Sequence, residues 1–300
     1  MKNLLISVLG PTASGKTDLG IRIAKHFNSE IISADSRQFF KEMPIGTAQP
    51  NAEELKNIKH HFIAQLSVHD EMNVGKFEVD AIDCLNNLFK KNPIQVLVGG
   101  SGLYVDAVLR GFDNVPPKDD LIRNELIANY EKHGIDFLRN KLIELDPIQF
   151  SKMDTSNPQR LMRALEICLI TGKTNDHFKK KTYASRNFIP IKIGIDMDRE
   201  ILYDRINRRV DQMMDMGLLK EAENLFPFKH LGTLQTVGYK ELFDFIEGKT
   251  NLEKAIDLIK QHTRNFAKRQ MTWFRRDQEI KWIKPENMDA YILDLENELQ

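Results

Sequence analysis

Short apolar runs alternate with helical patterns along the first third of the chain. Leu4–Leu9 is a mostly apolar run with the length of a buried strand, and it ends at a glycine and a proline. The elements predicted in order are a strand over Leu4–Leu9, a helix over Thr17–Phe27, a strand over Glu30–Ser33, a helix over Val74–Lys91, a strand over Gln95–Val98 and a helix from about Gly102. This strand–helix alternation predicts an α/β fold with a parallel sheet.

The pattern becomes helical in the middle of the chain. Pro116-Pro117 marks a boundary, and the periods from 119 to about 173 are those of helices. A strand over Ile189–Ile195 then returns to the sheet, and the chain is helical from Asp198 onward. We therefore predict an α/β core made of residues 1–112 and 191–300, with a helical C-terminal region, and a helical insertion at 113–190.

One helix of the insertion has clear start and stop signals. Asn157 followed by Pro158 is typical of an N-cap and a first helical residue, and Gly172 is typical of the position just past a helix end. The segment from Lys173 to Asn187 reads as a basic loop or hairpin. The apolar stripe of this helix is predicted to contain Leu161, Leu165, Cys168 and Leu169.

Composition narrows the class of protein. The chain has 300 residues, 41% hydrophobic and 29% charged, which is ordinary for a folded domain. Its two cysteines, Cys84 and Cys168, exclude a disulfide framework and a cysteine-based zinc finger, and they fit a reducing compartment. We find no targeting segment and no apolar run long enough to cross a membrane, so we expect a cytoplasmic protein without membrane contact. Lys plus Arg equals Asp plus Glu, 43 each, so any basic surface must be local.

A glycine-rich phosphate loop follows the first strand. GPTASGKT matches GxxxxGK[ST] between a predicted strand and a predicted helix, the context that the motif requires. Its backbone N–H groups and the helix N-terminus favour a diphosphate or longer phosphate, Lys16 can neutralise charge and Thr17 can bind Mg²⁺. A chance turn is the alternative. The predicted binding residues are Gly10, Pro11, Thr12, Ala13, Ser14, Gly15, Lys16 and Thr17.

Two further strand ends carry candidate chemistry. Asp35 follows the second strand, at the sheet edge where α/β proteins bind ligands, and it could act as a general base or a metal ligand. A helix cap or a turn is the alternative role. The third strand ends in Gly99-Gly100 without a carboxylate, and Ser101 then offers a hydroxyl, unless the glycines merely form the turn. A conventional NTPase is thus only partly supported.

Basic residues gather on two predicted helices. Lys260, Arg264, Lys268 and Arg275 project within one quadrant of a helix that also carries aromatic residues, as expected for contact with a nucleic-acid backbone. A solvated charged face is the alternative. Arg160, Arg163 and Lys179–Lys181 add positive charge elsewhere. Arg205 and Arg209 share a face, either as surface residues or as a diphosphate clamp.

The order of the motifs resembles one family over nearly the whole chain, from Gly10 to Arg275. The family is that of the tRNA dimethylallyltransferases, also called tRNA isopentenyltransferases. The matching motifs are GPTASGKT, SADSRQ, GTAQP, VLVGGSGLYV, NPQRLMRALEICLITGK, RINRRVDQM, TLQTVGYKE and RQMTWFR. The resemblance implies a P-loop-kinase-like core and an insertion that contacts tRNA. It also implies transfer of a dimethylallyl group from dimethylallyl diphosphate to the exocyclic N6 of the adenosine beside the anticodon, in tRNAs that read codons beginning with U.

The resemblance assigns roles by motif position. Asp35 would be the catalytic base, with Ser101 and Thr17 beside it, and Thr17 would hold Mg²⁺. Arg209 would join Gly10–Thr17 in binding the diphosphate. The implied partners are dimethylallyl diphosphate and the tRNA anticodon stem-loop, for a protein expected to be a monomer. The residues predicted to contact tRNA, those of the basic helix included, are Asp35, Ser36, Arg37, Gln38, Ser101, Arg123, Gln159, Arg160, Leu161, Met162, Arg163, Lys260, Arg264, Lys268 and Arg275.

Three positions depart from the family pattern. Ser101 stands where the family has Thr, Gln49 where Lys is usual and Phe40 where Tyr is common. Three other activities fit parts of the sequence. A small-molecule kinase would use the phosphate loop alone, an RNA-binding NTP switch would lack prenyl chemistry, and a prenyltransferase for free adenylate would need neither the insertion nor the basic helix.

Overall fold

The computed structural model describes residues 2–113, 115–179 and 184–299. The chain divides into a core unit, Met1–Arg110 with Ser185–Gln300, and an insertion unit, Gly111–Ala184. The insertion predicted over 113–190 therefore ends earlier than expected, because strand β5 begins at Phe188 and belongs to the core sheet. Lys180 and Lys181, which were predicted to add positive charge, lie outside the described residues.

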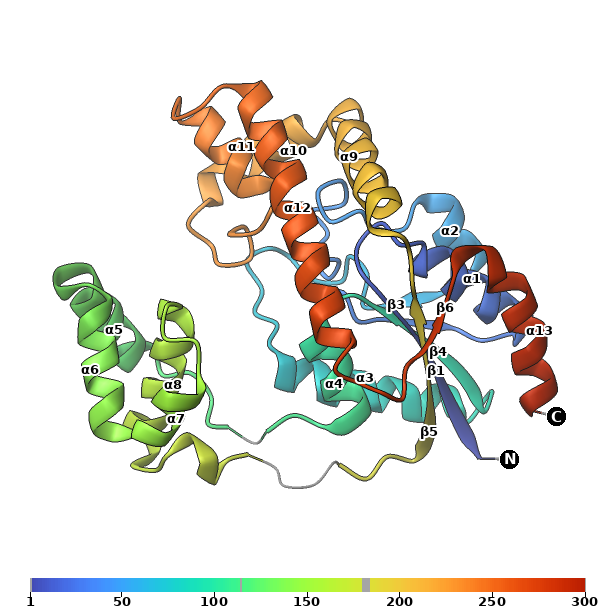
Figure 1. The fold of residues 1–300 in the computed structure, drawn as a ribbon, viewed down its shortest axis with the longest axis horizontal. Helices are drawn as coiled ribbons and strands as arrows, with labels where there is room; N and C mark the ends of the chain where they lie inside the picture. Colours follow the sequence, from blue (N-terminus) through green and yellow to red (C-terminus); the bar gives the residue numbers. More distant parts are fainter. Residues whose placement is uncertain (1, 114, 180–183, 300) are drawn as a thin grey trace. The chain divides into compact units, whose positions relative to one another are not determined.

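Within the described residues, six parallel strands form one sheet in the order β3-β2-β4-β1-β5-β6 (Figure 1). The strands are β1 (Asn3–Leu9), β2 (Ile31–Ser33), β3 (His60–His61), β4 (Ile94–Gly99), β5 (Phe188–Ile195) and β6 (Lys281–Ile283). The α/β prediction and four of its strands are confirmed. The two edge strands, β3 and β6, were not predicted, because two or three residues carry no readable period.

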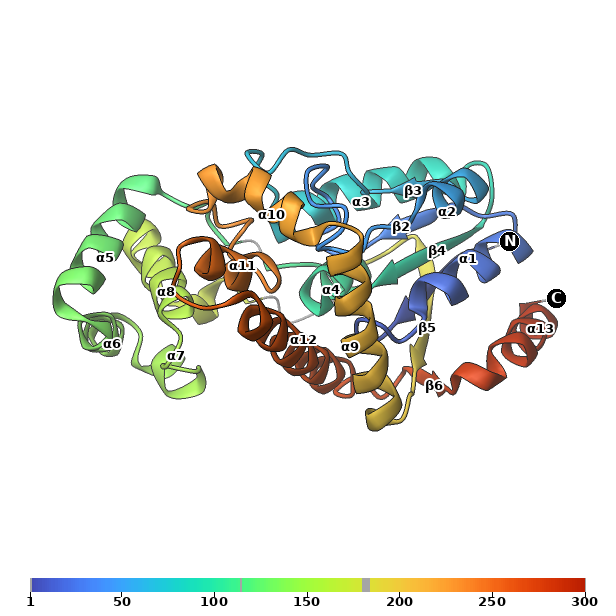
Figure 2. The same ribbon diagram turned by 90° about the horizontal axis from the view of Figure 1, so that it is seen from above.

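Helices cover both faces of the sheet (Figures 1 and 2). Leu5 and Leu9 of β1 pack into the apolar core under α3 and α4, whereas Ile6 and Val8 pack into the core under α1 and α13. The core helices are α1 (Lys16–His26), α2 (Ala52–Asn57), α3 (Val74–Phe89), α4 (Gly102–Arg110), α9 (Arg199–Asp215), α10 (Leu218–Leu225), α11 (Tyr239–Ile246), α12 (Leu252–Phe274) and α13 (Met288–Leu299). A strand whose side chains are buried on both faces of a sheet has a continuous apolar sequence, as β1 does.

The insertion unit has its own apolar core. Its helices are α5 (Asp120–His133), α6 (Ile135–Leu145), α7 (Pro147–Lys152) and α8 (Pro158–Thr171). The side chain of Asn157 accepts from the backbone N–H of Gln159 and Arg160, and Gly172 takes a φ of 66°, so both predicted ends of α8 are confirmed. The predicted stripe is wrong at Leu169, which is 42% exposed, while Leu161 and Leu165 are buried.

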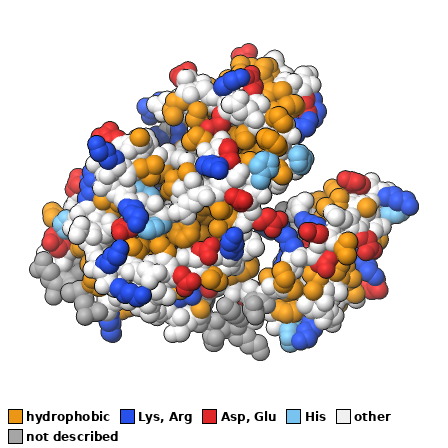
Figure 3. All heavy atoms as spheres, turned by 180° about the vertical axis from the view of Figure 1, so that it is seen from behind, with side chains coloured by type: hydrophobic (Ala, Val, Ile, Leu, Met, Phe, Trp, Pro, Cys, Tyr) orange, Lys and Arg blue, Asp and Glu red, His pale blue; other side chains and the backbone are white. Residues whose placement is uncertain are grey.

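Surface charge is mixed. Figure 3 shows basic and acidic side chains interspersed over one face of the molecule, with apolar side chains between them. Among the described residues, no helix is both long and apolar enough to cross a membrane.

A buried carboxylate anchors the loop that follows β2. Glu221 of α10 accepts hydrogen bonds from the backbone N–H of Ile45 (2.9 Å) and Gly46 (2.8 Å) and from the hydroxyl of Tyr239 (2.6 Å). Burial, and then the negative charge of Glu221, raise the pKa of the Tyr239 hydroxyl, which therefore stays a donor. The phenol ring lies so close to Gly46 that a Cβ there would be 2.5 Å from the Tyr239 oxygen. Glu221 therefore holds this part of the loop through its backbone N–H groups.

We expect Glu221→Gln to destabilise the core, because an amide replaces one acceptor oxygen with a donor that faces backbone N–H groups. The cost should be about 2 kcal/mol, the penalty for unpaired buried donors. Thermal unfolding should show the melting temperature about 5 °C lower for a unit of this size. Glu223→Gln, on the same helix but paired with Lys220 at the surface, is the control and should melt as the wild type does. Equal melting of both variants would show that Glu221 does not anchor the loop.

Candidate active site

The phosphate loop curls at the end of β1. Ala13 (φ 63°) and Gly15 (φ 96°) adopt left-handed backbone conformations, which turn successive N–H groups inward as anion-binding loops do. The hydroxyl of Ser14 is buried and has no hydrogen-bond partner among the described residues. The loop therefore presents polar groups at the N-terminus of α1, where the helix dipole also favours an anion.

Lys16 lies inside this loop. Only 9% of the residue is exposed, and its Nζ donates to the carbonyl oxygen of Pro11 at 3.3 Å. Burial, assisted by the charge of Arg209, lowers the Lys16 pKa to about 8 against the opposing effect of Asp35. A bound anion would favour the protonated lysine.

Arginines of α9 complete the cationic side of the loop. Arg209 Nη1 lies 3.5 Å from Thr12 Oγ1, and burial lowers the pKa of its guanidinium. Arg205 and Arg208 line a cavity of about 540 Å³ together with Arg209, Lys16 and Thr17. Of the two roles considered for the Arg205 and Arg209 face, the diphosphate clamp fits this geometry better than a surface role.

The end of β2 meets the end of β4 at Ser101, the serine predicted to belong to the site. Ser101 Oγ accepts from the backbone N–H of Ser36 at 3.0 Å and lies 3.1 Å from Ser36 Oγ. Asp35, the neighbour of Ser36, accepts from the backbone N–H of Arg37 at 3.3 Å. A Cβ on Gly99 would lie 2.6 Å from the Ala34 carbonyl oxygen, so glycine permits the close approach of the two strand ends. The Ser101 hydroxyl thus organises the backbone beside Asp35, and the glycines do more than make a turn.

A cavity of about 790 Å³ joins these groups. Thr12, Asp35, Ser101 and Arg209 line its polar part. Its apolar wall includes Ile206, Val210, Met213, Leu218 and Phe266. A smaller cavity of about 20 Å³ is lined by Lys16, Thr17 and Asp35. The hydroxyl and carboxylate oxygens there are of the kind that Mg²⁺ prefers, so the residues fit the expected metal.

Other predicted contacts after β2 have structural partners. The side chain of Gln38 donates to the carbonyl oxygens of Thr47 (3.3 Å) and Ala48 (3.0 Å), and Arg37 Nη1 donates to the Thr233 carbonyl oxygen at 3.0 Å. Of these two, Arg37 also lines the large cavity, as Ser36 does. Gln38 instead secures the loop.

The departures at Gln49 and Phe40 also have structural settings. Gln49 Nε2 donates to the carbonyl oxygens of Gln38 (3.2 Å) and Phe40 (2.8 Å), while the Phe40 side chain is buried in the apolar core. Both residues therefore hold the loop in place.

The basic face predicted on α12 is only partly free. Lys260 pairs with Asp211 at 2.6 Å, and Arg264 donates to Asn207 Oδ1 at 2.6 Å, so both side chains are engaged with α9. The predicted tRNA contacts of these two residues stay predictions, because a helical period gives the members of a face but not the neighbouring helix whose side chains pair with them. Lys268 is exposed, and Arg275 pairs with Asp196 at 3.3 Å while most of its side chain stays in solvent.

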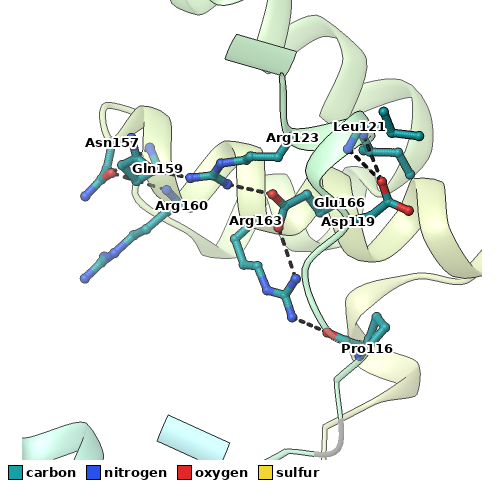
Figure 4. A network of polar contacts seen from close by, with 10 residues as sticks. Pro116, Asp119, Leu121, Arg123, Asn157, Gln159, Arg160, Arg163 and Glu166 are labelled. Carbon is teal, nitrogen blue, oxygen red and sulfur yellow. Dashed lines mark hydrogen bonds and ion pairs between the residues drawn. The ribbon is translucent and has the colours of Figure 1, made fainter. Parts of the chain in front are cut away.

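In the insertion unit, three of the residues predicted to contact RNA form a network around Glu166 (Figure 4), namely Arg123, Gln159 and Arg163. The side chain of Glu166 is 0% exposed and accepts from Arg123 Nη1 (2.9 Å) and Arg163 Nη1 (3.0 Å). Arg123 also donates to Gln159 Oε1. Gln159 and Arg160 are exposed.

Two predicted RNA contacts of the insertion are wrong. The side chains of Leu161 and Met162 lie in the apolar core of the unit, with 0% and 1% exposure, and cannot reach a partner. A motif match carries over positions, whereas the direction of each side chain depends on the packing of α8.

Sequence reasoning missed Gln270. It lies on the face of α12 that lines the large cavity with His262, Phe266 and Trp273, and its side chain contacts both glycine turns. The only signal was its place within RQMTWFR.

The parallel sheet, the phosphate loop and the helix dipole behind it define a P-loop protein. Residues 38–277 match the IPP transferase family. The chain is 54% identical to the tRNA dimethylallyltransferase of Christiangramia forsetii, over 98% of this chain and 97% of that protein. It is 51% identical to the tRNA dimethylallyltransferase of Flavobacterium psychrophilum, over 98% of each chain.

Solved structures agree with these relatives. The full-length tRNA isopentenylpyrophosphate transferase of Bacillus halodurans superposes with a TM-score of 0.72 at 36% identity, over 99% of this chain and 96% of that one. A eukaryotic dimethylallyltransferase acting on tRNA gives a TM-score of 0.75 at 25% identity, over 94% of this chain and 74% of that one. The chain belongs to the IPP transferase family.

The lowered pKa of Lys16, about 8, predicts a pH dependence of anion binding. The lysine is protonated below this value and neutral above it, so affinity for inorganic pyrophosphate should fall as pH rises through 8. Because inorganic pyrophosphate itself loses a proton in this range, the wild type is compared with Lys16→Met at each pH. We expect the affinity of the wild type relative to Lys16→Met to fall by up to about tenfold between pH 7.5 and 9, measured by calorimetry. Lys25→Met, exposed on the same helix, should behave as the wild type. A ratio that is constant over this range would contradict the assignment.

Proposed function

We propose that this protein is a tRNA dimethylallyltransferase. It transfers the dimethylallyl group of dimethylallyl diphosphate to the exocyclic N6 of the adenosine beside the anticodon, in tRNAs that read codons beginning with U, and releases diphosphate. The observation that carries the proposal is the single cavity whose wall combines the carboxylate of Asp35 with Thr12 and Arg209 at the phosphate loop. The relatives named above support the same reaction.

The loop supplies what the leaving diphosphate needs. Negative charge grows on the diphosphate as the C–O bond breaks, and Lys16, Arg209 and the inward N–H groups of the loop would stabilise it. Mg²⁺, held by the Thr17 hydroxyl, would further neutralise the diphosphate oxygens. The allylic carbon can carry positive charge, so an early departure of the diphosphate is feasible.

Asp35 would act on the acceptor. An exocyclic adenine amine is a poor nucleophile, and transfer of its proton to the Asp35 carboxylate as the bond forms would assist the attack. The Ser36–Ser101 contact fixes the backbone on which Asp35 sits. A stacked base could not reach this cavity, so the adenosine would be flipped out of the anticodon loop.

The large cavity offers surfaces for both reactants. Its apolar wall suits a five-carbon prenyl group, and its volume of about 790 Å³ is within the range of small-molecule sites. Phe266 at its wall carries the Arg269 guanidinium 5.8 Å from the ring centroid, an arrangement on which nucleobases stack. Exposed cations near the end of α12, Lys268 and Arg276 among them, would meet the tRNA backbone.

We propose that the protein acts as a monomer in the cytoplasm, where tRNA is found.

The direct test supplies the wild-type protein with dimethylallyl diphosphate, Mg²⁺ and unmodified tRNA, followed by mass analysis of the nucleosides. Prenylated adenosine should appear. A parallel reaction with labelled ATP should give no phosphorylated product, whereas a kinase would form one. Free AMP should not be prenylated. Prenylated AMP without prenylated tRNA would favour the free-nucleotide enzyme instead.

Asp35→Asn should slow prenylation by about 10²-fold or more, because the amide keeps the shape of the side chain but cannot accept the proton. The rate is measured with tRNA and dimethylallyl diphosphate both saturating, and the affinity for dimethylallyl diphosphate should change little. Asp257→Asn, on the exposed side of α12, is the matched control. Full turnover of Asp35→Asn would remove Asp35 from the mechanism.

A further inference from the structure

Gln270 makes two hydrogen bonds of opposite kind inside the core unit. Its Oε1 accepts from the backbone N–H of Thr12 at 2.9 Å, and its Nε2 donates to the carbonyl oxygen of Gly100 at 2.8 Å. The residue is 5% exposed. Because one partner is a donor and the other an acceptor, they fix the orientation of the amide. An amide satisfies both partners, whereas a carboxylate could only accept.

These two bonds join the two glycine turns of the site. Thr12 belongs to the phosphate loop and lies beside Arg209. Gly100 directly precedes Ser101, whose hydroxyl holds the backbone next to Asp35. A single side chain therefore connects the part of the site that would hold the diphosphate with the part that would hold the amine.

The approach of Gln270 requires glycine at position 100. A Cβ there would lie 2.4 Å from Gln270 Nε2, inside any permitted contact. Trp273, one turn further along α12, contacts the same junction. A Cβ on Gly102 would lie 2.3 Å from the indole Cδ1, and the indole Nε1 donates to Asp106 Oδ2 at 2.9 Å. Helix α12 is thus held against Gly100 through Gln270 and against Gly102 through Trp273. Gln270 therefore cannot move with the phosphate loop unless the rest of the helix also moves.

We propose that Gln270 is a positioning residue for the transfer reaction. It holds the Thr12 backbone at a fixed distance from the Ser101 and Asp35 edge, so that the departing diphosphate and the attacking amine stay aligned. A displacement of about 1 Å between reacting groups can cost 10²-fold in rate, although each substrate still binds. The inference rests on the proposed function and concerns the alignment of its two substrates.

The test compares Gln270→Met and Gln270→Glu with the wild type. Methionine fills the same space without hydrogen bonds, and a glutamate carboxylate can accept from Thr12 but cannot donate to Gly100. We expect kcat to fall by tenfold or more in both variants. The dissociation constants of Gln270→Met for inorganic pyrophosphate and for tRNA should stay within about threefold of wild type. Gln261→Met and Gln261→Glu, exposed on the same helix, are the matched controls and should retain kcat.

The measurements separate alignment from folding. Melting temperatures are recorded for each variant, and Gln270→Glu decides the matter if Gln270→Met does not fold. Unchanged kcat in a folded Gln270 variant overturns the proposal. A fall in kcat accompanied by an equal loss of both affinities also overturns it, because that pattern indicates general loss of structure. If the wild type itself makes no prenylated adenosine, the proposed function is wrong. If the wild type and Gln270→Met are equally active, only the positioning role of Gln270 is overturned.

Discussion

The parallel pairing of β1 with β4 and with β5 is the constraint on which the site depends. Each strand runs in the same direction, so the carboxyl ends of β1, β2 and β4 reach one edge of the sheet. The phosphate loop, Asp35 and the Gly99-Gly100 turn follow these three ends. Residues far apart in sequence therefore meet without a dedicated binding domain. Glycine at these turns lets the backbones approach within contact distances that a Cβ would forbid.

Helices beside this edge of the sheet fix the positions of the site residues relative to one another. Helix α9 contributes Arg209 to the loop, and α12 contributes Gln270, which bonds to both turns. The two helices are linked through Lys260 and Arg264. Burial lowers the pKa of Lys16, and the two nearby charges act in opposite directions, since Asp35 raises this pKa and Arg209 lowers it. Binding of a diphosphate would add the negative charge that this cluster of cations favours.

The sequence was informative where the chemistry is local. The strands around Leu4–Leu9 and Ile189–Ile195, the cap at Asn157 and the phosphate loop follow from neighbouring residues, and the structure contains all of them. Contacts between distant elements could not be predicted this way. The period of α12 placed Lys260 on a basic face but gave no sign that Asp211 pairs with it, and the motif around Leu161 did not reveal that its side chain is buried. Gln270 stayed hidden because its two partners are backbone groups.

We propose that a diphosphate in the phosphate loop and the reacting carbon beside Asp35 occupy one cavity. A crystal structure with Mg²⁺ and a dimethylallyl diphosphate analogue, in which sulfur replaces the bridging oxygen, is the sharpest test. We predict that the diphosphate lies in the phosphate loop against Lys16 and Arg209, with the prenyl group inside the cavity and facing Asp35. A diphosphate bound away from the loop, or a prenyl group outside the cavity and out of reach of Asp35, would contradict the account.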